Sequence, residues 1–87
     1  MRLPIIKNLV EFIENNDEDY LNETIEVLES LSEAKGIKDE EMEVIGELMS
    51  NMFGAIEVHQ SMQSGKSQKE ALNEFMQRVM GSIDKGS

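Results

Sequence analysis

The residues of this chain that could bind a metal ion are its single histidine and its many carboxylates. Its 87 residues include one histidine, no cysteine, and eighteen aspartates and glutamates. A di-iron site in a helical bundle needs inward glutamates together with two Glu-x-x-His pairs. The glutamate nearest to His59 is Glu57, which lies two positions away instead of three. We therefore predict that no metal is bound and that His59 is a structural or interfacial residue.

An acidic stretch over residues 15–26 partly matches a calcium-binding loop. Counted as a twelve-residue loop, it carries oxygen-bearing side chains at positions one, three, five, nine and twelve. Position six requires glycine for a sharp turn but holds Tyr20, and apolar residues at helical spacing begin at Leu21. A helix capped by Asn16 or Asp17 explains the same acids without an ion. We therefore expect no calcium site.

Gly65-Lys66-Ser67 matches the end of a phosphate-binding loop. The first glycine of that motif would fall at Gln60, and the segment before it has the pattern of a helix instead of the required strand. The serines of the chain have no motif that links one of them to a base. We therefore predict no catalytic residue, no cofactor and no enzymatic activity.

Apolar residues at helical spacing predict four helices. The expected helices cover residues 4–14 and 18–34, a long stretch between Asp39 and Ser64, and residues 68–81. Gly36 is suited to the left-handed position that follows a helix, here the second. Ser67 and Glu70 match a capping box at the start of the fourth helix, and Gly81 is expected to end it.

The third expected helix is apolar around much of its circumference. One row has alternating spacings of three and four, typical of packed helices: Met42, Ile45, Met49, Met52, Ile56 and His59. Small residues recur every four positions at Gly46, Ser50 and Gly54, which places them on one face. Because a glycine costs about 1 kcal/mol of helix propensity relative to alanine, this stripe indicates close approach of another backbone, either within the chain or from a second copy of it. We predict a homodimer with an interface formed by Gly46, Met49, Ser50, Met52, Phe53, Gly54, Ile56 and His59.

The chain is strongly acidic, with a formal net charge of −10. Residues 11–57 hold fifteen carboxylates against two lysines. Such a surface repels the phosphates of nucleic acid, so we expect no nucleic-acid binding. The carboxylates either keep the protein in solution or bind a basic partner through Glu23, Glu26, Glu29 and Glu33.

The apolar runs of the sequence are short. None has the length of a signal peptide or of a transmembrane helix. The lack of cysteine fits a reducing compartment. We therefore expect a cytoplasmic protein that does not bind membranes.

Three motifs spread over nearly the whole chain carry a resemblance to a known family. They are Asn16-Asp17-Glu18-Asp19-Tyr20, then Val44-Ile45-Gly46-Glu47-Leu48 with Asn51 and Gly54, and finally Gly81-Ser82-Ile83-Asp84-Lys85. On these motifs the chain resembles a family of short acidic bacterial proteins of unknown function, and the motif in the long helix is the most specific. The resemblance implies no activity, cofactor or catalytic residue.

These observations predict an all-α fold, a small four-helix domain with a long central third helix. One domain is expected over residues 1–81, followed by a flexible C-terminal tail over residues 82–87. The expected function is a non-enzymatic protein–protein interaction module that forms a homodimer through the long helix. An acidic regulatory or adaptor protein that binds a basic partner is the first alternative. A metal-dependent helical-bundle enzyme, assembled across a dimer that brings two His59 residues together, is the second.

Overall fold

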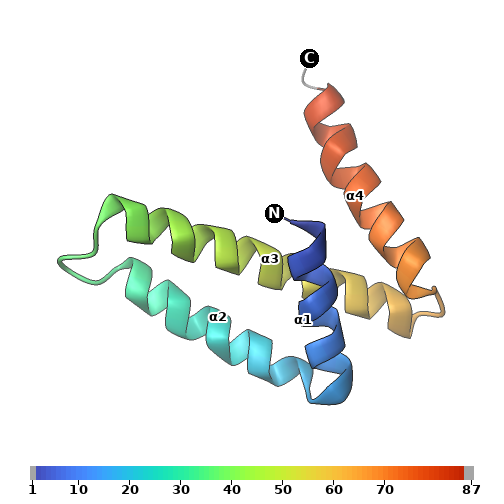
Figure 1. The fold of residues 1–87 in the computed structure, drawn as a ribbon, viewed down its shortest axis with the longest axis horizontal. Helices are drawn as coiled ribbons and strands as arrows, with labels where there is room; N and C mark the ends of the chain where they lie inside the picture. Colours follow the sequence, from blue (N-terminus) through green and yellow to red (C-terminus); the bar gives the residue numbers. More distant parts are fainter. Residues whose placement is uncertain (1, 86–87) are drawn as a thin grey trace. The chain divides into compact units, whose positions relative to one another are not determined.

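The computed structural model describes residues 2–85, and the side chains of residues 2–79. Four helices are labelled in Figure 1: α1 (Leu3–Asn15), α2 (Glu18–Ser32), α3 (Asp39–Gln63) and α4 (Gln68–Lys85). The prediction of an all-helical chain whose third helix is the longest is confirmed, since α3 has 25 residues. The chain divides into two compact units, one up to Ile56 and one from Glu57 onwards, so the division falls within α3.

Apolar side chains from three helices form the core of the first unit. The buried apolar residues of this unit are Ile6, Val10, Ile13, Leu21, Ile25, Ile45 and Ala55. Those of α1 recur at spacings of four and three, which places them on one face of that helix. Pro4 lies in the first turn of α1, where the backbone N–H that proline lacks has no partner within the helix. α1 and α2 contact each other.

A loop over residues 33–38 joins α2 to α3, and the two helices run in opposite directions from it (Figure 1). Gly36 has a φ of 87°, which is the left-handed conformation predicted for it. α2 ends at Ser32, two residues earlier than predicted. The reason is that the N–H groups of Glu33 and Ala34 bond to carbonyls three residues back, at 3.2 and 3.0 Å, so the chain winds more tightly there.

Two predicted helix caps are confirmed. Oδ1 of Asp17 accepts a hydrogen bond from the N–H of Asp19 at 3.1 Å at the start of α2. At the start of α4, Oγ of Ser67 accepts from the N–H of Glu70 at 3.2 Å, and Oε1 of Glu70 accepts from the N–H of Ser67 at 3.3 Å. This reciprocal pair is the capping box expected from the sequence.

The second unit consists of the end of α3, a short connection and α4. Among its described side chains, the buried apolar ones are those of Val58, Ala71, Leu72 and Phe75. The prediction that Gly81 ends the last helix is wrong, because α4 continues to Lys85. A glycine inside a helix costs only about 1 kcal/mol relative to alanine, so it need not stop one. The tail predicted over residues 82–87 therefore begins inside α4, and residues 86–87 lie outside the described residues.

Candidate interaction surface

The residues predicted to form the interface lie in three different environments on α3. Gly46 and Phe53 are exposed, and Gly54 is buried. The other five are half-buried: Met49, Ser50, Met52, Ile56 and His59. Because the chain itself covers Gly54, that glycine is not available to a partner, whereas Gly46 is. The stripe of small residues is thus exposed at Gly46, half-buried at Ser50 and buried at Gly54.

One side of α3 exposes apolar residues to solvent. Met42, Gly46, Met49 and Phe53 follow one another at spacings of four, three and four, which places them along one side of the helix. Met42 is 40% exposed and Phe53 is 53% exposed. A Cβ atom added to Gly46 would meet nothing within 4 Å. We call these four residues the outer stripe. Ile45, which the sequence placed in the same row as Met42, is instead buried in the core.

A second row on α3 is buried at one end only. Val44, Leu48, Asn51 and Ala55 also follow at spacings of four, three and four. Val44 and Leu48 are 58% and 41% exposed, whereas Asn51 and Ala55 are 2% and 0% exposed. We call these four residues the inner stripe. Its phase on the helix is roughly opposite to that of the outer stripe, since Val44 and Phe53 are separated by two and a half turns.

Asn51 holds the buried part of the inner stripe in place. Its Oδ1 accepts a hydrogen bond from the backbone N–H of Arg2 at 2.8 Å, and its Nδ2 donates to the carbonyl of Glu47 at 2.9 Å. The start of α1 therefore lies against the middle of α3. Sequence reasoning assigned Asn51 no structural role. The signal that could have identified it is an amide side chain within the largely apolar run from Met49 to Ile56.

A hollow of about 590 Å³ lies at the loop end of the α2–α3 hairpin. Its apolar lining includes Leu31 from α2, Ile37 from the loop, and Val44 and Ile45 from α3. The charged residues of its lining are Lys35, Glu40 and Glu41. This volume lies within the range of ligand and side-chain pockets.

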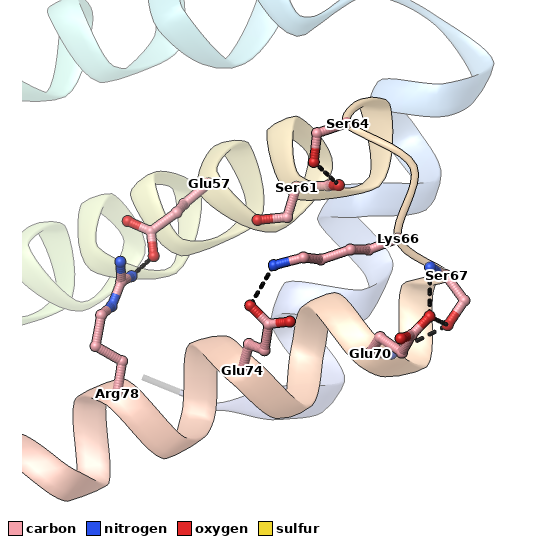
Figure 2. Close-up of polar contacts among 8 residues, drawn as sticks. All are labelled: Glu57, Ser61, Ser64, Lys66, Ser67, Glu70, Glu74 and Arg78. Atoms are coloured by element: carbon pink, nitrogen blue, oxygen red, sulfur yellow. Dashed lines mark hydrogen bonds and ion pairs between the residues drawn. The ribbon is translucent and has the colours of Figure 1, made fainter.

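A polar cluster joins α4 to the end of α3 within the second unit (Figure 2). Arg78 forms an ion pair with Glu57, and Lys66 forms one with Glu74. The guanidinium carbon of Arg78 also lies 5.7 Å from the ring centroid of Phe75. Each of the two carboxylates thus has a cation beside it, and all four charged side chains are 39–59% exposed. The pair of Arg78 with Glu57 links α4 to the end of α3, and the pair of Lys66 with Glu74 links the connection to α4.

The stretch considered as a calcium loop is helical from Glu18 onwards, with Asp17 used as a cap. The serine of the phosphate-loop match, Ser67, is likewise used as a cap. Within the part of the chain that the structure describes, no three His, Cys, Asp or Glu side chains lie close enough together to hold a metal ion. Over the same residues, no helix combines the length and apolar character that a membrane span requires.

The fold and these surfaces define a small all-helical protein with uncovered apolar rows on its longest helix. The chain belongs to a family of unknown function, DUF6952, whose model matches residues 1–84. No curated protein and no solved structure matches the chain.

Proposed function

We propose that this protein is a non-enzymatic protein–protein interaction module that pairs with a second copy through the outer stripe of α3. The observation that carries the proposal is the exposure of Phe53 and Met42 in line with the open backbone at Gly46. Burial of apolar area stabilises an interface by about 25 cal/mol per Å² before the costs of association. A large aromatic side chain that is half exposed supplies much of that area.

Gly46 supports a close contact between helices. Its φ is not positive, and a Cβ atom would have open space around it. Neither backbone conformation nor packing within the chain therefore requires glycine at this position. Alanine would raise helix stability by about 1 kcal/mol, so the glycine is better explained by a second helix whose backbone comes close to it.

Charge opposes this pairing and makes it sensitive to salt. Each chain carries a formal net charge of −10, so two copies repel each other. Ions screen that repulsion over roughly 8–10 Å near physiological ionic strength. We therefore expect self-association to become stronger as salt is added. Binding of a basic partner would respond in the opposite direction.

Two asparagine variants of α3 test the proposal. Phe53→Asn removes an apolar side chain from the outer stripe, whereas Val44→Asn makes a similar change at an equally exposed position of the inner stripe. We expect Phe53→Asn to weaken dimerisation about tenfold or more and Val44→Asn to leave it nearly unchanged. The dimer dissociation constant can be measured by sedimentation equilibrium. Equal effects of both variants, or no dimer in the parent protein, would contradict the proposal.

A second variant tests the close approach at Gly46. Gly46→Leu adds bulk where the chain itself leaves open space, so the monomer should fold normally while the helices of the dimer are pushed apart. Gly54 is unsuitable for this test because it is buried within the chain.

We also expect the protein to act in the cytoplasm and its relatives to be short acidic bacterial proteins.

A further inference from the structure

We propose that the open end of the α2–α3 hairpin is a docking site for a basic amphipathic helix of another protein. This inference is independent of the proposed homodimer, because it concerns the inner stripe and the hollow beside it. The outer stripe lies on a different side of α3.

One end of the inner stripe is buried within the chain, and the other end is exposed. Asn51 and Ala55 are buried, and the backbone N–H of Arg2, just before α1, bonds to the side chain of Asn51. Figure 1 shows that the hairpin extends well past the place where α1 crosses it. Val44 and Leu48 continue the same row towards the loop but stay 58% and 41% exposed. Another helix could therefore cover this end of the row as α1 covers the middle.

The hollow supplies a place for apolar side chains of the incoming helix. Leu31, which is 47% exposed, lines it from α2 and Val44 lines it from α3, and Ile37 and the buried Ile45 also line it. Helix recognition in a groove depends on apolar anchors that recur every three or four residues. A hollow of about 590 Å³ has room for one or two such anchors.

The carboxylates at and around the hollow favour a basic partner. Glu40 and Glu41 line the hollow, and residues 18–56 hold eleven carboxylates against two lysines. The N–H of Lys38 donates to Oε1 of Glu41 at 3.0 Å, which orients that carboxylate at the start of α3. A second copy of this chain would bring the same excess of carboxylates to the site. A different protein, with lysines or arginines beside its apolar anchors, has the complementary charge.

A designed peptide can serve as the probe. We choose a helix of about 18 residues made of leucine and lysine, with leucines in one amphipathic stripe. Two control peptides have the same length: one has the same composition in scrambled order, and one replaces every lysine by glutamate. Affinity is measured by fluorescence anisotropy, and the contact surface is mapped from backbone amide shifts of labelled full-length protein.

The protein variants form two matched pairs. Val44→Asn alters the inner stripe and Phe53→Asn the outer stripe. Glu40→Gln removes a carboxylate that lines the hollow, and Glu11→Gln removes an exposed one on α1 that is not among its lining residues. We expect Val44→Asn to weaken binding of the leucine–lysine helix about tenfold and Glu40→Gln about threefold, with less than about twofold change for either control.

The expected amide shifts lie around Leu31, Ile37 and Val44. Equal binding of the scrambled peptide would show that net charge alone attracts the probe, and would overturn the proposal. Equal binding of the glutamate peptide would overturn the assignment of a basic partner. Unchanged affinity of Val44→Asn, with a native circular dichroism spectrum, would overturn the location. Loss of dimerisation in Phe53→Asn with normal peptide binding would show that the two surfaces act separately.

Discussion

The backbone N–H of Arg2 donates a hydrogen bond of 2.8 Å to Oδ1 of Asn51, a residue 49 positions further along the chain. Asn51 is 2% exposed, and its amide also bonds to the carbonyl of Glu47 one turn earlier in α3. One buried side chain therefore fixes the start of α1 against the middle of the longest helix. It also marks where the inner stripe changes from covered to open.

We predict that Asn51→Ala destabilises the fold by about 1–3 kcal/mol, because the N–H of Arg2 loses its acceptor in a partly buried place. Unfolding in urea, followed by circular dichroism, measures this change. Asn73→Ala is the matched control, since Asn73 is exposed on α4; its effect should stay within about 0.5 kcal/mol. Equal effects of the two substitutions would show that Asn51 does not hold α1 in place.

The local features of the chain were predictable because neighbouring residues determine them. The cap at Asp17, the capping box at Ser67 and the left-handed Gly36 each depend on a few adjacent positions. Which faces of α3 are buried within the chain could not be predicted from neighbouring residues in this way. Ile45 and Met42 share a row in the sequence, but only Ile45 is buried. A helix that is apolar nearly all round does not reveal which face its own chain will cover.

Alanine substitutions at two glycines test the backbone conformations at Gly36 and Gly46. Gly36→Ala should lower the free energy of unfolding by about 1 kcal/mol, because φ is 87° and alanine is strained there. Gly46→Ala should raise the stability of the monomer by about 1 kcal/mol, since Gly46 is helical and a Cβ atom meets nothing within 4 Å. Urea unfolding at low protein concentration measures both. The same sign for the two variants would contradict this assignment.

His59 is predicted to be structural. His59→Leu should leave the helical circular dichroism spectrum intact and change stability by at most about 1–3 kcal/mol, because the residue is half-buried on α3. Elemental analysis of purified protein gives an independent check on the alternative of a metal-dependent enzyme. Zinc or iron retained in stoichiometric amount by the parent protein and lost in the variant would refute a purely structural role.

Salt is predicted to raise the melting temperature between low ionic strength and about 0.3 M sodium chloride. Repulsion among the fifteen carboxylates of residues 11–57 is screened by added ions. The ion pairs of Arg78 with Glu57 and of Lys66 with Glu74 are substantially exposed, so each contributes at most about 1 kcal/mol and its screening costs little. Differential scanning calorimetry measures the trend. A steady fall would mean that ion pairs, not repulsion, dominate.

Calcium and magnesium serve as controls in the same melts. We expect equal small shifts from the two ions, because the acidic stretch after Asp17 is the first turn of α2 rather than a loop. Strong stabilisation by micromolar calcium, with no matching effect of magnesium, would instead reveal a specific calcium site.

The mass of the protein in solution tests self-association most directly. Multi-angle light scattering at micromolar concentration should give twice the 9.9 kDa of one chain for the parent protein and for Val44→Asn. Phe53→Asn should give a mass close to that of a single chain, because it removes the largest exposed side chain of the outer stripe. The mass of one chain for the parent protein throughout the micromolar range, in both low and moderate salt, would contradict a homodimer formed through α3.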